Sequence, residues 1–343
     1  MTTQTPEQVD TLPASWYCDP ARWPLERAEI FAPSWQLIGH ESEMARPGAW
    51  IADTIAGYPL LVVRSETGAL NGFHNVCRHR AGPIATTRTG QCDGALVCAY
   101  HGWRYALDGR LREARDFGAA PGFDPRAFAL FPVRVATWRG LVFVCQSPDA
   151  APLADWLAPL DARLGDADWT NLRVALSRTH DLACNWKTYA ENYLEGYHVP
   201  LIHPGLDAEI ESDRYVVTMD GRIAFHDAPR RTPDAIYDGL WAWAWPNLGV
   251  NVYRRGLMME RISPMGPHAT RLDYLYLTPD GEDVPAETLA MSDQVTAEDK
   301  AIVESVQINL AAGLYERGRL SPRHEGGVRA FQGFVAAALG GAG

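Results

Sequence analysis

Short apolar runs separated by glycine-containing turns dominate the chain between residues 35 and 147. The runs Pro59–Val63 and Leu141–Val144 are typical of strands, because they are short, apolar and bounded by turn residues. An Asp108-Gly109 pair, flanked by Tyr105–Leu107 and by Arg110-Leu111, predicts a tight hairpin. We therefore expect this part of the chain to form a small antiparallel β domain.

The pattern changes after about residue 150. Helices are predicted at 153–164 and 183–199, followed by a strand-rich stretch at 214–278 and a long helix at 296–316. A further amphipathic helix is expected near 25–31. The predicted organisation is an N-terminal segment, 1–34, that packs with the C-terminal domain, a β domain, 35–150, and a larger domain, 151–343. The predicted fold class is α+β.

Composition and charge exclude several classes of protein. With 47% hydrophobic and 21% charged residues among 343, the chain has an ordinary globular composition. Its net charge of −11 argues against binding to nucleic acid or to an anionic membrane. No apolar run reaches the roughly 18 residues that span a bilayer, and the N-terminus lacks the pattern of a signal peptide. We therefore expect a cytoplasmic protein whose six cysteines are reduced.

Two loops in the β domain each offer one thiol and one imidazole. They read Cys77-x-His79 and, after eighteen intervening residues, Cys98-x-x-His101. Zinc could use these four residues, but a zinc finger groups its cysteines together and its histidines together. Mixed loops suit a Rieske [2Fe–2S] centre, in which two cysteines hold one iron and two histidines hold the other. The remaining cysteines have no matching histidine and are expected to be structural: Cys18, Cys92, Cys145 and Cys184.

A second candidate metal site lies in the segment 185–203. Glu191, Glu195 and His198 stand at i, i+4 and i+7, on one stripe of the predicted helix. Pro200 would break or kink that helix, so that His203 could turn back towards His198. Two imidazoles and one carboxylate form the facial triad of non-haem Fe(II) oxygenases. A solvated polar helix face would produce the same pattern, so both interpretations stay open on these residues alone.

Together the two patterns resemble the α (oxygenase) subunit of the Rieske non-haem iron oxygenases. This ring-hydroxylating group also contains choline- and betaine-type N-oxygenases. The resemblance runs along nearly the whole chain and is carried by Asn75–Arg80, Cys98–Trp103 and Asn185–His203. The chain departs from the family in having Ala99 where proline is frequent. It is also compact for the group, which puts an accessory β subunit in doubt.

The resemblance implies a helix-grip fold for the larger domain, with helices on a curved antiparallel sheet. It also implies catalytic roles for Glu195, which would link the two metal centres across a subunit boundary, and for Asn192, close to the iron. The third iron ligand would come from a late helix, where Asp299 shares a stripe with Val303 and Val306. Alternatively, Thr296 caps that helix and Asp299 lies in its first turn. Glu298 and Glu304 are the reserve ligands.

The substrate pocket is harder to place. Trp241, Trp243 and Trp245 alternate with a period of two, so on a strand they face one way, most simply into the core. Alternatively, Trp243 and Trp245 line the pocket with Tyr253, and Met258 or Met259 could join them. Such a pocket could take an aromatic ring, or hold a quaternary ammonium group by cation–π contact. The remaining histidines are expected to be structural or exposed: His40, His74, His180, His226, His268 and His324.

The implied function is the terminal oxygenase of a multicomponent system, a mono- or dioxygenase that hydroxylates or demethylates a small aromatic or methylated-amine substrate. Electrons would pass from NAD(P)H through a separate flavin/iron–sulfur reductase, possibly with a ferredoxin, to the [2Fe–2S] cluster and then to mononuclear Fe(II), where O₂ reacts. The chain has no Gly-rich dinucleotide fingerprint of its own. The resemblance further implies a homotrimer and, for many members, a role in aromatic hydrocarbon catabolism. The competing hypothesis is a Rieske electron-transfer protein with a non-catalytic ligand-binding domain.

Overall fold

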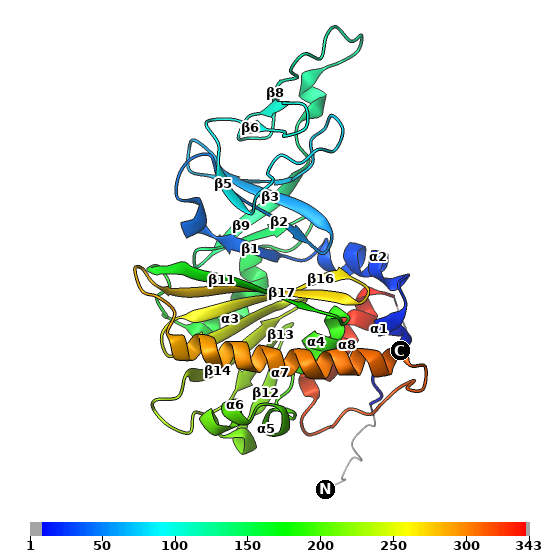
Figure 1. The fold of residues 1–343 in the computed structure, drawn as a ribbon, viewed down its shortest axis with the longest axis vertical. Coiled ribbons are helices and arrows are strands. Elements are labelled where there is room, and N and C mark those ends of the chain that lie inside the picture. The colour runs from blue at the N-terminus through cyan, green and yellow to red at the C-terminus, as the bar shows by residue number, and fades with distance from the viewer. Residues whose placement is uncertain (1–8, 341–343) are drawn as a thin grey trace. The chain divides into compact units, whose positions relative to one another are not determined.

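The structure (Figure 1), a computed structural model, describes residues 9–340 and separates into two compact units. The β unit runs from Phe31 to Trp156, and the α/β unit combines the segment up to Ile30 with the chain from Leu157 onward. The sequence placed these divisions at 34 and 150. Residues 1–8 and 341–343 of the predicted domains lie outside the description. Among the helices formed by residues 9–340, none combines the length and the apolar character needed to cross a membrane.

The β unit consists of antiparallel strands, as the apolar runs predicted. Seven strands form one sheet in the order β1-β10-β9-β4-β3-β2-β5, and three short strands form a second, β6-β7-β8. The Asp108-Gly109 turn joins β7 and β8, and Gly109 adopts a φ of +84°, in the left-handed region that glycine favours. The strands are β1 (Gln36–His40), β2 (Ala49–Ile55), β3 (Tyr58–Arg64), β4 (Leu70–His74), β5 (Thr89–Gln91), β6 (Leu96–Val97), β7 (Arg104–Tyr105), β8 (Leu111–Glu113), β9 (Pro132–Trp138) and β10 (Leu141–Cys145).

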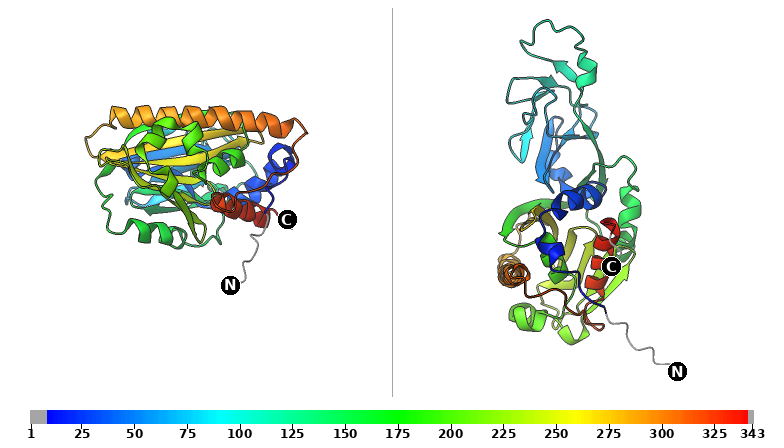
Figure 2. Two further views of the ribbon diagram at one scale, coloured as in Figure 1. Left: turned by 90° about the horizontal axis from the view of Figure 1, so that it is seen from below. Right: turned by 90° about the vertical axis from the view of Figure 1, so that its right-hand side faces the viewer.

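The α/β unit is built on one antiparallel sheet of seven strands in the order β11-β17-β16-β15-β14-β13-β12. The long helix α7 (Ala286–Ala311) lies along one face of this sheet (Figure 2) and packs against α4 (Trp186–Tyr193). The strands are β11 (Leu172–Leu182), β12 (Val216–Asp220), β13 (Ile223–Asp227), β14 (Tyr237–Ala244), β15 (Leu248–Tyr253), β16 (Leu257–Gly266) and β17 (Ala269–Pro279).

Shorter helices complete both units. They are α1 (Ser15–Cys18), α2 (Arg22–Glu26), α3 (Leu153–Leu164), α5 (Val199–Ile202), α6 (Pro204–Glu209) and α8 (Gly326–Ala338), with short 3₁₀ or π turns at Arg27–Phe31, Glu41–Met44, Pro125–Phe128 and Ser212–Arg214. The predicted helices at 25–31 and 153–164 are thus present. The boundary between the two units falls within α3.

Two predicted helix boundaries are wrong, and both corrections affect the functional site. The helix expected at 183–199 ends at Tyr193, so Glu195 and His198 lie beyond it and share no helical stripe with Glu191. Pro200 lies in the first turn of α5, where the N–H group that proline lacks would have no partner within the helix. It therefore does not break or kink a long helix, as the sequence had suggested. The late helix begins at Ala286, ten residues earlier than expected. Going back along the chain from residue 296, Pro285 is the first residue that would prevent the helix from extending further.

A buried ion pair joins the N-terminal segment to α4. Lys187 and Glu26 are almost completely inaccessible to solvent and form a salt bridge, while Trp186 Nε1 donates to Glu26 Oε2 at 2.9 Å. Burial lowers the pKa of Lys187, and the Glu26 carboxylate opposes that shift. Removing one partner would leave an unpaired buried charge, so this pair holds α4 in place. The candidate metal-site residues come directly after α4 in the chain.

Candidate metal centres

The two loops of the β unit bring their thiols and imidazoles together. Cys77 and Cys98 are each 2% exposed, and both burial and the neighbouring Cys77 thiol raise the pKa of Cys98. The His79 and His101 rings lie 4.6 Å apart between centroids, and Trp103 stacks on His79 at 4.8 Å. His79 Nδ1 is buried and has no hydrogen-bond partner among the described residues. A nitrogen left without a partner beside paired thiols fits the donor set of a Rieske cluster.

Each loop is held by its own backbone. The Cys77 N–H donates to Gly82 O at 2.8 Å, and the Cys98 N–H donates to Trp103 O at 2.9 Å. A side chain at Gly82 would begin 3.0 Å from the Cys98 sulfur and 2.8 Å from Tyr100, so glycine permits the two loops to approach. The Tyr105 hydroxyl lies 3.1 Å from the Cys77 sulfur. The local turn geometry therefore explains the short spacing between cysteine and histidine in each loop.

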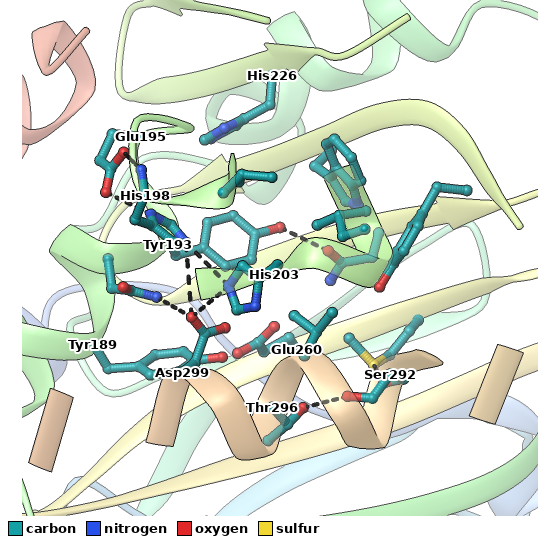
Figure 3. Close-up of a pocket in the computed structure, with 18 of the residues that line it drawn as sticks. Tyr189, Tyr193, Glu195, His198, His203, His226, Glu260, Ser292, Thr296 and Asp299 are labelled. Atoms are coloured by element: carbon teal, nitrogen blue, oxygen red, sulfur yellow. Dashed lines mark hydrogen bonds and ion pairs between the residues drawn. The ribbon is translucent and has the colours of Figure 1, made fainter. Parts of the chain in front are cut away.

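In the α/β unit, three side chains converge on one point. His198 Nε2 lies 3.2 Å from His203 Nε2 and 3.7 Å from Asp299 Oδ1, and His203 Nε2 lies 3.0 Å from the same oxygen (Figure 3). Ligand atoms placed about 2.1 Å from one ion at adjacent octahedral positions are about 3 Å apart. The arrangement of His198, His203 and Asp299 therefore fits a single metal ion with three further positions open.

A carboxylate stands behind each histidine. His198 Nδ1 lies 2.6 Å from Glu195 Oε1, and His203 Nδ1 lies 2.7 Å from Glu298 Oε2. An acid at Nδ1 favours the tautomer that leaves the Nε2 lone pair free for a metal. Burial by itself would lower the pKa of His203, but the Asp299 and Glu298 carboxylates raise it above its ordinary value. This surplus of negative charge favours a cation at the point of convergence.

Asp299 lies in the middle of α7, and the capping alternative is therefore wrong. Thr296 is an internal helical residue whose hydroxyl donates to Ser292 O at 2.8 Å. Asn192 Nδ2 donates to Asp299 Oδ1 at 2.6 Å, so Asn192 positions the carboxylate. Of the two reserve ligands, Glu298 faces the far nitrogen of His203, and Glu304 accepts from the Ala183 N–H at 2.8 Å, away from the three converging atoms.

Glu191 takes no part in this site. It lies on another face of α4, where its Oε1 accepts from the Tyr17 hydroxyl at 2.5 Å and from Gln332 Nε2 at 3.0 Å. Burial raises the pKa of Glu191 to about 7. The three-residue stripe inferred from the sequence therefore divides into a partly buried structural acid and two residues at the candidate metal centre.

The converging side chains open into a cavity of about 90 Å³ that is continuous with solvent. Tyr253 and Met258 line it, as considered from the sequence, and so does Trp241. Trp243 and Trp245 do not; their rings pack on Phe331 of α8, at centroid distances of 5.4 and 5.8 Å. Two residues along a strand move a side chain by about 7 Å, which is enough to leave the cavity for the core.

The sequence did not single out several other residues of the cavity wall. Tyr215 stacks on Trp241 with centroids 6.0 Å apart, and its hydroxyl lies 2.8 Å from His226 Nδ1. Glu260, from β16, is 2% exposed, and burial raises its pKa to about 8. The available signal was the charge itself, a glutamate directly after the apolar run Leu257–Met259.

Comparison with known proteins identifies the family. Residues 34–124 match the Rieske [2Fe-2S] domain, and residues 169–341 match the ring hydroxylating alpha subunit (catalytic domain). The carnitine monooxygenase oxygenase subunit of Escherichia coli K12 is 30% identical over 333 residues, which cover 92% of this chain and 88% of that protein. The chloroplastic choline monooxygenase of Arabidopsis thaliana is 29% identical over 337 residues, covering 91% and 79%.

Solved structures agree with this result. The quaternary ammonium Rieske monooxygenase CntA in complex with L-carnitine matches with a TM-score of 0.87 and 26% identity, covering 98% of this chain and 97% of that one. Naphthalene 1,2-dioxygenase from Rhodococcus sp., at 19% identity and a TM-score of 0.78, shares the fold.

The chain belongs to the ring-hydroxylating α-subunit family, joined to a Rieske domain. It is an oxygenase of the Rieske type, and the predicted α+β fold, enzyme class and cofactors are confirmed. More particularly, it is an oxygenase component that uses a [2Fe–2S] cluster, mononuclear iron and O₂, with electrons from a separate electron-transfer protein.

Proposed function

We propose that this oxygenase acts on a methylated amine and inserts one oxygen atom into a C–H bond beside the nitrogen. The observation that carries this proposal is the cavity at the converging triad, which is walled by aromatic rings and acids. The relatives named for choline and carnitine oxidation support it. One atom of O₂ enters the substrate and the other leaves as water, which consumes two protons and two electrons from NAD(P)H. Hydroxylation of an N-methyl group would then release formaldehyde.

We infer that Cys77, Cys98, His79 and His101 hold the cluster in the domain 35–150, and that His198, His203 and Asp299 hold the iron in the domain 151–343. When bound, the cluster delivers electrons singly and the ferrous ion binds and activates O₂. The surrounding residues keep this site in order. Glu195 and Glu298 fix the two imidazole tautomers, and Asn192 fixes the carboxylate. The aromatic wall excludes water and surrounds the substrate.

We further propose a cyclic homotrimer in which Glu195 connects the iron site to the cluster of a neighbouring subunit. One solved relative is described as showing inter-subunit electron transfer, which supports an oligomer. Glu195 Oε2 already accepts from the backbone N–H groups of Tyr197 and His198, whereas Oε1 keeps a second lone pair beyond its bond to His198. The electron donor would be a flavin/iron–sulfur reductase. A cytoplasmic location stays a prediction.

A substrate panel tests the proposed reaction. Purified holoenzyme with a flavin/iron–sulfur reductase and NADH should consume O₂ when choline or another trimethylated amine is added, with about one NADH oxidised per product. Mass spectrometry identifies the product, and the His198→Ala variant controls for uncoupled oxygen reduction. Oxidation of aromatic acids without oxidation of any amine in the panel would contradict the assignment to methylated amines.

Glu195→Gln is expected to lower turnover by about 10- to 100-fold while the cluster spectrum stays normal, because an amide cannot satisfy both His198 Nδ1 and the two backbone donors. Glu298→Gln is the matched control, since Glu298 holds His203 in the same way. Stopped-flow reoxidation of the pre-reduced cluster by O₂ compares the two variants at equal iron content.

If Glu195 also connects the subunits, reoxidation should be much slower in Glu195→Gln than in Glu298→Gln. Equal reoxidation rates in the two variants would limit Glu195 to orienting His198 and would remove the inter-subunit connection.

A further inference from the structure

The cavity contains one acid that the metal centre does not use. Glu195 and Asp299 contact the iron-site histidines, but Glu260 Oε1 is buried without a hydrogen-bond partner among the described residues. Figure 3 shows Glu260 in the same cavity as His203 and Asp299. Burial raises the pKa of Glu260 to about 8, so ionising this acid in the empty cavity is unfavourable, and a cationic ligand beside it would supply the missing partner.

The sheet explains why Glu260 reaches the cavity. Glu260 in β16 pairs with Gly249 in β15, which has no side chain to cover it. Asn251, two residues along the same face, is 6% exposed, and its Nδ2 also has no partner within residues 9–340. The Tyr193 hydroxyl, 3.1 Å from Asn251 Oδ1, fixes the amide. Glu260 and Asn251 therefore lie close together in the cavity wall, and each keeps one polar side-chain atom without a partner among the described residues.

Aromatic rings surround this polar pair. Tyr237 lies 5.1 Å from Trp241 and 5.0 Å from Tyr253 between ring centroids, and all three line the cavity. Faces of Trp and Tyr attract a trimethylammonium group by cation–π contact, and a nearby carboxylate adds Coulombic attraction.

A substrate carboxylate would lack a charged side-chain partner in this cavity. Its described lining residues include no lysine and no arginine. His226 lines the cavity too, but burial lowers its pKa to about 3, so it is neutral. A zwitterionic amine acid would place its own carboxylate in the same cavity as Glu260, without a lysine or arginine side chain to compensate, which is unfavourable.

We propose that Glu260 makes this oxygenase selective for methylated amines that carry a positive charge and no carboxylate. This inference rests on the proposed function and narrows its substrate class. The amino alcohol choline fits the cavity, whereas betaine- and carnitine-type zwitterions do not. Asn251 would donate to the hydroxyl of such an amino alcohol.

Isothermal titration calorimetry on the oxidised holoenzyme under anaerobic conditions tests the proposal without turnover. The three probes are choline, its neutral carbon isostere 3,3-dimethylbutan-1-ol, and glycine betaine. Choline should bind at least about tenfold more tightly than either of the others. In Glu260→Gln, the preference for choline over the isostere should shrink to the residual cation–π contribution, below about threefold.

Glu191→Gln is the matched control, because it makes the same change at a partly buried acid outside the cavity, and it should keep the wild-type ratios. The wild-type ratios decide the question even if Glu260→Gln does not fold. Betaine binding as tightly as choline, or an unchanged choline preference in Glu260→Gln, would overturn the role of Glu260. If betaine is bound and oxidised, the proposed function stands and only this inference fails; if no trimethylated amine binds, both fail.

Discussion

His198→Ala is expected to lose all measurable turnover, a decrease of at least about 100-fold, while keeping a normal cluster spectrum. Removing this imidazole leaves only His203 and Asp299 at the point of convergence, and two ligands do not retain a ferrous ion. Iron analysis should fall from about three to about two atoms per chain. The result would separate the two centres, because the ligands proposed for each lie in different units of the fold.

His324→Ala is the matched control. His324 stacks on Tyr197, one residue before His198, but contributes no atom to the converging group. This variant should retain all its iron and its activity. Product formation by His198→Ala at the wild-type rate would show that the iron lies elsewhere.

Cys98→Ala is expected to abolish the cluster and, with it, all turnover supported by NADH. Without that thiolate, one iron of the cluster keeps a single cysteine ligand, and the buried loop pair no longer closes around it. The visible absorption and the EPR signal of the reduced cluster should disappear. Mononuclear iron should still bind, at about one atom per chain.

Cys92→Ala provides the comparison for this variant. The Cys92 thiol lies six residues earlier in the chain and donates to Gly48 O at 3.3 Å, a structural contact. Its loss should leave the cluster spectrum intact. An undiminished Rieske spectrum in Cys98→Ala would show that the ligand set is wrong.

The sequence predicts the cluster loops well because their chemistry is local. Cys77 and His79 lie two residues apart and Cys98 and His101 three, and turns of that length leave little conformational choice. The iron-site histidines are similarly close in sequence. The sequence nevertheless placed His198 on a helix, which is wrong, because helix propensity does not reveal that α4 ends at Tyr193.

Contacts between residues far apart in the sequence were harder to predict. Glu298 meets His203 over 95 residues, and the pairing depends on where α7 packs. The side-chain alternation at Trp241, Trp243 and Trp245 predicts which face of the strand they share, but not how far the cavity extends along it. Glu260 was visible as a charge after three apolar residues, but its importance depends on neighbours from β15 and α4.

A single-turnover measurement tests the central claim most directly. Holoenzyme whose cluster has been reduced chemically, with excess reductant removed, is mixed with O₂ in the presence or absence of choline, and the cluster spectrum and the products are followed together. The account predicts substrate-dependent reoxidation of the cluster and an oxidised amine product without any reductase, both lost in His198→Ala. Reoxidation without product from any amine or aromatic substrate would contradict it and favour an electron carrier.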